Sequence, residues 1–226
     1  MAYCNAVFEL SGTRGHNETK IKTFDELVEI GERTSSVNLD WQTLMCRLAV
    51  LFWMRQYKDF AELSEIYPCS PSTGQKRCLT IARVFYEGIA HLNLARDTRQ
   101  PKWRLMGENA VIKIAHLERT MSKWNLEHKS KLLQAELHYL DGRIESAADA
   151  YKASIKSARE RKFINDEALA CELYGIFCVE NHMANEGSKQ LHMALEKYKL
   201  WGAIKKVNEV QLLINLINPA SFWKPK

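Results

Sequence analysis

The sequence has few of the residues that interrupt helices. Only 5 prolines and 10 glycines occur among 226 residues, and so few helix breakers favour long helices over many short strands. Long hydrophobic runs are also missing, since the most apolar stretch, LAVLFWM at 48–54, lies between Arg47 and Arg55. A transmembrane helix needs about 18 consecutive apolar residues. We therefore predict no transmembrane segment, and the first residues do not have the pattern of a secretory signal.

The six cysteines lack the spacings of a metal site. No CxxC pair occurs, and therefore no combination of a CxxC pair with a His-x-x-x-His element. The sequence accordingly predicts no zinc ion. With 46% hydrophobic residues, a chain of this length has enough core to fold without disulfides. We expect reduced cysteines and a cytoplasmic location, in a reducing intracellular compartment.

Motifs for catalysis are missing as well. The sequence has no GxxxxGK[ST] phosphate loop and no HRD or DFG kinase motif, and its seven histidines are scattered singly. The stretch from Ser72 to Lys76 superficially resembles a phosphate loop, but no strand is predicted before it. We therefore predict a protein that is not an enzyme, with no catalytic residue, no cofactor and no metal.

Hydrophobic periodicity instead predicts helices along most of the chain. The first begins at the capping box from Thr23 to Glu26, and the second begins at Asp40. The clearest loop is PCSPSTGQ at 68–75, and Trp124 is expected to end a helix. The expected helices, before the repeated part of the chain, span 23–32, 40–54, 57–67, 76–95 and 102–123.

Two later segments align at a spacing of 40 residues, AELHYLDGRIESAADAYKASI at 135–155 and GIFCVENHMANEGSKQLHMAL at 175–195. Small residues recur where two helices of a hairpin must approach closely, as at Ala147 and Gly187. Large residues recur where the groove between hairpins must be filled, as at Tyr151 and Leu191. Such a period is typical of α-solenoids, whose repeats cannot bury their apolar faces alone.

The stretch EKYKLWGAIKKVNEVQ at 196–211 predicts how the repeats end. Gly202 can adopt the left-handed conformation that terminates a helix, and Trp201 can cover the end of the core. A closing helix is then expected to pack over the last hairpin through five residues. These are Ala203, Ile204, Val207, Val210 and Leu213.

The predicted fold is all-α, a tetratricopeptide-like α-solenoid of antiparallel helix hairpins with a C-terminal capping helix. We expect one helical repeat domain at 21–216, preceded by a segment at 1–20 of no clear structure and followed by a tail at 217–226. A weaker repeat at 44–66 is also predicted.

Two motifs in the repeated part, GRIESAADAYKASIKSARERKFINDEALACELYG and YKLWGAIKKV, carry a family resemblance. The chain resembles the tetratricopeptide-like helical-repeat region of large multidomain hybrid sensor histidine kinases, over about 41–211 and most strongly from residue 123. Those proteins also contain serine/threonine-kinase-like, AAA-type ATPase and GAF domains. The resemblance implies an α-helical interaction region, from either a larger polypeptide or a stand-alone derivative, and their enzymatic motifs are missing here.

Two groups of residues are candidates for binding a partner. The first lies on the first helices of the hairpins and would face the inner surface of a solenoid. The second is a basic stripe on one helix, at i, i+4 and i+7. The candidates are Gln134, His138, Glu172 and Ile176 in the first group, and Lys152, Lys156 and Arg159 in the second.

The leading functional hypothesis is a scaffold or regulatory module that binds a protein partner in signalling or in a multiprotein assembly. One alternative is a signal-relay fragment of a multidomain sensor kinase or ATPase. Another is an RNA-binding helical repeat that acts through the basic stripe. Nucleic acid is the less favoured partner, because a net charge of +5 is modest and a solvated lysine-rich face explains it.

Overall fold

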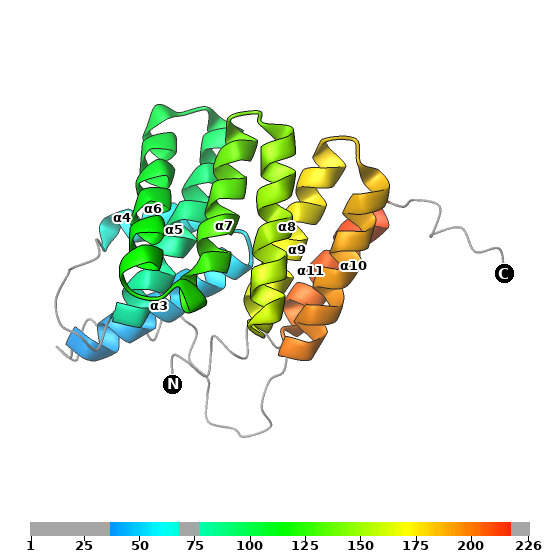
Figure 1. Cartoon of the computed structure of the whole chain (residues 1–226). Coiled ribbons are helices and arrows are strands. Elements are labelled where there is room, and N and C mark those ends of the chain that lie inside the picture. The colour runs from blue at the N-terminus through cyan, green and yellow to red at the C-terminus, as the bar shows by residue number, and fades with distance from the viewer. Residues whose placement is uncertain (1–36, 68–76, 218–226) are drawn as a thin grey trace, which may run out of the picture. The chain divides into compact units, whose positions relative to one another are not determined.

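The computed structural model describes residues 37–67 and 77–217, which form nine helices and no strand. The contacts divide the chain into two compact units, Met1–Gly107 and Glu108–Lys226. The all-α prediction is therefore confirmed for the described residues (Figure 1). The helix predicted at 23–32 and the loop predicted at 68–75 lie outside them. The helices are α3 (Val37–Trp53), α4 (Tyr57–Ile66), α5 (Arg77–Thr98), α6 (Pro101–Thr120), α7 (Lys123–Leu140), α8 (Ile144–Glu160), α9 (Ile164–Glu180), α10 (Ala184–Trp201) and α11 (Ile204–Ile217).

In the first unit, α3, α4 and α5 pack around an aromatic core. Phe52, Phe60 and Phe85 are fully buried there. The buried Arg83 guanidinium donates hydrogen bonds to the carbonyl oxygens of Ser64 and Tyr67, at 2.9 and 2.6 Å. Because these carbonyls lie at the end of α4, where no intrahelical donor reaches them, the arginine fastens that helix end to α5.

One predicted boundary is wrong. Trp124 was expected to end a long helix, but α6 ends at Thr120 and Trp124 lies in the first turn of α7. The cause is Ser122, whose hydroxyl accepts a hydrogen bond from the backbone N–H of Asn125 at 3.2 Å. This side-chain cap starts a new helix at Lys123, one residue before the tryptophan.

In the second unit, α7 and α8 form one antiparallel hairpin and α9 and α10 form the next (Figure 1). Their turns are equivalent at the predicted spacing of 40 residues, since Gly142 and His182 both have a positive φ, of 72° and 62°. The backbone N–H of Arg143 donates to His138 O at 2.9 Å, and that of Met183 donates to Cys178 O at 2.8 Å. His182 thus adopts the left-handed backbone conformation in the second turn that Gly142 adopts in the first.

The small residues of the second hairpin allow α9 and α10 to touch. A Cβ atom added at Gly175 would lie 2.7 Å from Leu191 Cγ. A Cβ atom added at Gly187 would lie 2.6 Å from Val179 Cγ2 and 2.9 Å from the carbonyl oxygen of Gly175. Real Cβ atoms do not approach so closely, so this crossing requires glycine on both helices.

The structure confirms part of the predicted C-terminal arrangement. Gly202 ends α10 in the left-handed conformation, with φ 82° and ψ 14°, and Ala203 and Val210 are buried. The prediction that Ile204 packs on the core is wrong, because its side chain is exposed at the first position of α11. Trp201 is likewise only partly covered, beside Tyr198 at a ring-centroid distance of 6.3 Å.

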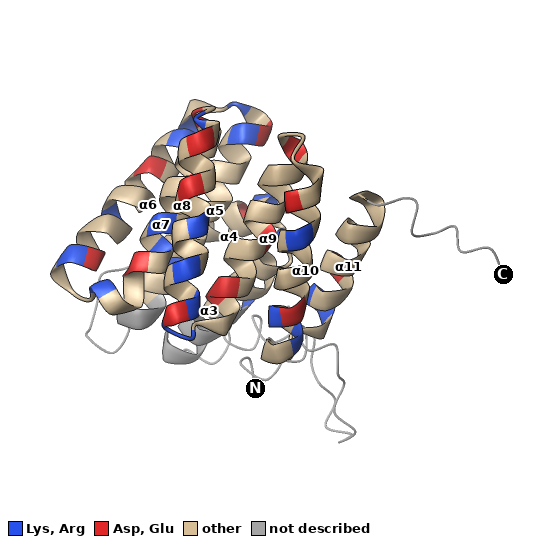
Figure 2. Ribbon diagram, turned by 45° about the vertical axis from the view of Figure 1, so that its right-hand side comes forward, with Lys and Arg blue, Asp and Glu red and all other residues tan. Residues whose placement is uncertain are grey.

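Charge is unevenly distributed along α8. Its first half carries the acidic residues Glu145 and Asp149, and its second half carries Lys156 and Arg159 together with the terminal Glu160 (Figure 2). Because α8 runs between the two ends of its hairpin, the two ends differ in charge. Lys152 lies near the middle of the helix.

Candidate functional site

The densest polar chemistry of the second unit surrounds α9. This helix is apolar on all sides, and its neighbours α7, α8, α10 and α11 bury it. It nevertheless carries three buried carboxylates, Asp166, Glu167 and Glu172. A buried charge is costly unless it is paired and hydrogen-bonded, so the partners of these three groups show what they do.

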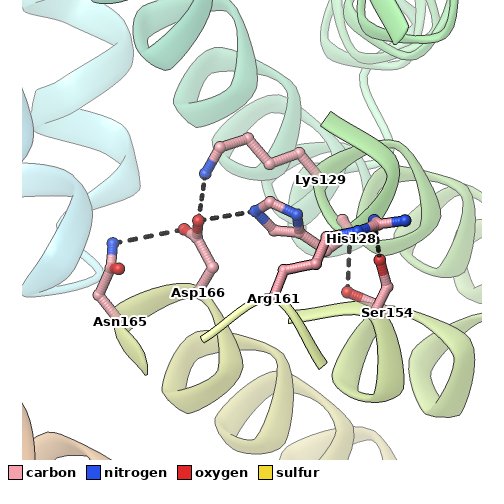
Figure 3. A network of polar contacts seen from close by, with 7 residues as sticks. His128, Lys129, Ser154, Arg161, Asn165 and Asp166 are labelled. Carbon is pink, nitrogen blue, oxygen red and sulfur yellow. Dashed lines mark hydrogen bonds and ion pairs between the residues drawn. The ribbon is translucent and has the colours of Figure 1, made fainter. Parts of the chain in front are cut away.

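Asp166 pairs with two side chains of α7 (Figure 3). Its Oδ2 atom lies 2.8 Å from His128 Nε2 and 2.6 Å from Lys129 Nζ. Burial alone would raise the pKa of Asp166, but Lys129 and the hydrogen bond from His128 lower it to about 2. Burial lowers the pKa of His128. The aspartate is therefore ionised and the imidazole neutral near pH 7, with the Nε2–H donating to the carboxylate.

A serine near this pair gives the residue types of a hydrolytic triad but not its geometry. The Ser154 hydroxyl donates to the backbone carbonyl of His128 at 2.8 Å, not to the imidazole ring (Figure 3). The ring of His128 is stacked on Phe163 at 4.5 Å, and Ser154 and Asp166 are both buried. A nucleophile must hydrogen-bond to its base and reach a substrate, so this cluster ties α7, α8 and α9 together instead.

Glu167 links α9 to the second helices of both hairpins. Its Oε1 atom accepts from Arg159 Nε of α8 at 2.8 Å, and its Oε2 atom lies 3.0 Å from Lys197 Nζ of α10. Both Asp166 and Glu167 lie in the first turn of α9, as predicted, where a negative charge complements the helix N-terminus. The two cations add interhelical contacts that the sequence did not indicate.

Glu172 links α9 to α10 and α11. Its Oε2 atom accepts from the Tyr198 hydroxyl at 2.5 Å, and its Oε1 atom accepts from Lys206 Nζ at 2.7 Å. Glu172 and Lys206 are each 1% exposed. A similar pair joins the first hairpin, where the Tyr151 hydroxyl donates to Glu136 Oε1 at 2.5 Å. Buried carboxylates paired with a tyrosine therefore recur in both hairpins.

The two described cysteine side chains are not activated thiols. Cys171 and Cys178 are buried and free. Burial and the nearby Glu167 carboxylate raise the pKa of Cys171 to about 12, and burial raises the pKa of Cys178 to about 11. Since the thiolate is the nucleophile and the metal-binding form, both are core residues at neutral pH.

The predicted inner-helix candidates are not equally accessible. Gln134, His138 and Ile176 are half-buried, and Glu172 is fully buried. A partner could therefore contact the first three only partly and Glu172 not at all. The prediction of Glu172 as a partner-binding residue is wrong, because Tyr198 and Lys206 enclose its carboxylate.

The predicted basic stripe lies on the surface of α8, as its spacing indicated, but its cations have acidic neighbours. Lys152 Nζ lies 3.7 Å from Asp149, and Lys156 Nζ lies 3.9 Å from Glu160. Arg159 donates to the buried Glu167. These pairs reduce the positive potential that a nucleic-acid phosphate would meet, although exposed pairs at such distances are weak.

The sequence interpretation missed a group of exposed apolar residues at helix ends. Trp124, Ile164 and Ile204 lie in the first turns of α7, α9 and α11 and are all exposed. They are spaced by 40 residues, so extending the repeat alignment in both directions would have found them. Exposed large apolar residues at equivalent positions are a candidate contact surface.

Among the residues that the structure describes, no group of three histidine, cysteine or acidic side chains is placed to hold a metal ion. Comparisons with protein-family models, curated proteins and solved structures found no match to this chain. The resemblance to the helical region of hybrid sensor kinases therefore stays a prediction from the sequence.

Proposed function

We propose that this chain is a non-catalytic, tetratricopeptide-like repeat module that binds a protein partner, as a scaffold or regulatory component of a signalling or other multiprotein assembly. The observation that carries the proposal is the repetition of one hairpin. The α7–α8 and α9–α10 hairpins turn in the same way 40 residues apart, and α11 packs on the second as the first helix of a further hairpin would. Stacked hairpins of this kind present an extended surface to a partner.

The use of the polar side chains also supports an interaction module. Asp166, Glu167 and Glu172 are each held by cations or hydroxyl groups from neighbouring helices. Their chemistry goes into fixing how the helices pack, which leaves the surface side chains of the second unit to meet a partner.

Two alternatives make different predictions. A relay fragment of a multidomain sensor kinase or ATPase rests on the sequence resemblance, and a longer native reading frame that encodes those domains would support it. An RNA-binding repeat rests on Lys152, Lys156 and Arg159, whose acidic neighbours make it the weaker alternative.

Affinity capture from native extract tests the proposal. The immobilised chain is washed at about 0.15 M and about 1 M salt, because electrostatic binding to nucleic acid weakens steeply with ionic strength. We expect one protein at fixed stoichiometry that survives the high-salt wash, identified by mass spectrometry. Nucleic acid alone, lost at high salt, would contradict the proposal.

A charge-reversed chain separates the proposal from the RNA alternative. The variant carries Lys152→Glu and Lys156→Glu on α8 and keeps Arg159, because Arg159 pairs with the buried Glu167. Capture of the protein partner should persist if the partner binds elsewhere on the repeats, whereas RNA capture through this stripe should be abolished. Lys58→Glu on α4 is the control, at an exposed lysine of the first unit that also has an acidic neighbour. It shows whether reversing the charge of any exposed lysine changes capture.

A further inference from the structure

One end of the second unit gathers exposed apolar and basic residues. Because α7 to α11 alternate in direction, the start of α7, the α8–α9 turn and the α10–α11 turn lie at the same end of the hairpins (Figure 1). We call this region the basic end. Its exposed apolar residues are Met121, Trp124, Ile164, Leu200, Trp201 and Ile204.

Two of these side chains are more than half exposed. Trp124 is 61% exposed and Leu200 is 71% exposed, although burying either would be favourable. The Arg161 guanidinium lies over the Trp124 ring, 5.2 Å from its centroid, and hydrogen-bonds Glu127. This contact holds an arginine beside the indole at the surface. The basic end therefore presents an exposed indole that packs against an arginine side chain, which is itself only 13% exposed and paired with Glu127.

Lysines lie among these apolar residues, whereas the opposite end of the hairpins is acidic. Lys123, Lys162 and Lys199 are exposed at the basic end, where Lys123 has Glu127 as a neighbour and Glu160 and Glu196 are also exposed. Around the turns at 141–143 and 181–183 the charged residues are mostly acidic, and Figure 2 shows red segments near those turns. The acidic residues there are Asp141, Glu145, Asp149, Glu180 and Glu186. An anionic surface would attract the basic end and repel the other, which orients the unit.

We propose that the basic end of the second unit docks on an anionic lipid membrane surface. Tryptophan and lysine side chains are favoured together at the level of lipid headgroups, where the indole and aliphatic groups enter the interface and the cations meet anionic lipids. None of the described helices is both long and apolar enough to cross a membrane, so the docking is peripheral.

The geometry favours a membrane over a nucleic acid. The apolar residues lie at the ends of three successive first helices, at a 40-residue spacing, so they form a row across the end of the unit. A row of helix ends matches a flat, continuous surface. Leu200 and Ile204 are aliphatic and exposed, and they would gain nothing from a phosphate backbone, which is bound by cations and by stacking aromatic rings.

Vesicle co-sedimentation of the full chain tests this proposal. Phosphatidylcholine vesicles are compared with vesicles that contain about 30% phosphatidylserine, in about 0.15 M salt. We expect binding mainly to the phosphatidylserine vesicles and a blue shift of tryptophan fluorescence. No binding to either vesicle would overturn the proposal, as would binding of an acidic polypeptide or RNA probe at the basic end without vesicle binding.

Two pairs of variants locate the surface. Trp124→Gln with Leu200→Gln, and Lys162→Glu with Lys199→Glu, should each lower the vesicle partition coefficient at least about tenfold. Matched controls lie away from the basic end. They are Leu212→Gln with Leu216→Gln on α11, where Leu216 is 77% exposed, and Lys152→Glu with Lys189→Glu on α8 and α10.

The controls distinguish binding through the basic end from non-specific hydrophobic or electrostatic adsorption to the vesicles. They should change the partition coefficient by less than about twofold, because they leave the interfacial groups in place. If the basic-end variants and their controls lower the partition coefficient equally, the proposal is overturned. Circular dichroism should give the same helix content for every variant, since all the substituted side chains are at the surface.

Discussion

The buried pair of Lys206 and Glu172 gives the sharpest prediction about stability. Both side chains are 1% exposed, and Lys206 Nζ lies 2.7 Å from Glu172 Oε1. Lys206→Met fills similar space but leaves the carboxylate without its buried cation. Removing one partner of such a pair typically costs about 3–5 kcal/mol, and we expect a loss in that range for the unfolding of the second unit.

A double-mutant cycle separates the pair from its surroundings. Glu172→Gln keeps an acceptor for the Tyr198 hydroxyl but removes the charge, at a cost of about 2–3 kcal/mol. In the double variant neither charge remains, so its cost should fall below the sum of the single costs by at least about 2 kcal/mol. That difference is the coupling free energy of the two charges.

The assay must resolve the second unit, because the chain has two compact units. Hydrogen exchange of α9 peptides, measured by mass spectrometry over a urea series, reports the opening of α9 itself. Lys152→Met is the matched control, since Lys152 is an exposed lysine 3.7 Å from Asp149, and it should change stability by no more than about 0.5 kcal/mol. Additive single effects, or a Lys206→Met cost below about 1 kcal/mol, would refute the reasoning.

Two further predictions follow from the core. Gly187→Ala should destabilise the second unit by about 2–3 kcal/mol in the same exchange assay, because the new Cβ meets the carbonyl oxygen of Gly175. Gly142→Ala, whose Cβ meets no atom within 4 Å but which has φ +72°, should cost only about 1 kcal/mol. Equal costs would contradict the packing argument. Burial lowers the pKa of His91 from 6.5 to about 4, so the folded state favours the neutral ring and the first unit should lose stability as the pH falls from 6.5 towards 4. His91→Phe should weaken this pH dependence of the urea midpoint, whereas an unchanged slope would exclude His91 as its source.

The sequence was sufficient to predict the elements that depend on local chemistry. The equivalent turns follow from a repeat in which His182 occupies the place of Gly142, and both residues adopt positive φ. Gly202 ends α10 as its left-handed preference predicts. Helix α4 begins at Tyr57, where its pattern begins, and ends at Ile66, one residue before the expected end.

The sequence was not sufficient where the outcome depends on residues far apart in the chain. Lys206 lies in a lysine-rich stretch typical of an exposed helix face, yet it reaches Glu172 across 34 residues. The carboxylate itself interrupts the apolar run ALACELYGIFCV, which is a signal that a buried partner is needed. The boundary predicted at Trp124 is wrong for a local reason, because the Ser122 hydroxyl caps the helix that contains the tryptophan.

The candidate contact surface could be predicted only in part. The stripe of Lys152, Lys156 and Arg159 was placed on a helix surface from its spacing alone. Its acidic neighbours Asp149 and Glu160 are also on α8 and were visible in the sequence. The row at the basic end needed the positions of three separate helix starts, which a pattern within one helix does not give.

If successive hairpins of the second unit act together as a protein-binding array, a bound partner should protect both of them. Hydrogen exchange of the chain alone and bound to its captured partner measures this most directly. We expect slower exchange in peptides of both the α7–α8 and the α9–α10 hairpins, at positions about 40 residues apart. Unchanged exchange in both hairpins, or slower exchange only in the first unit, would contradict it.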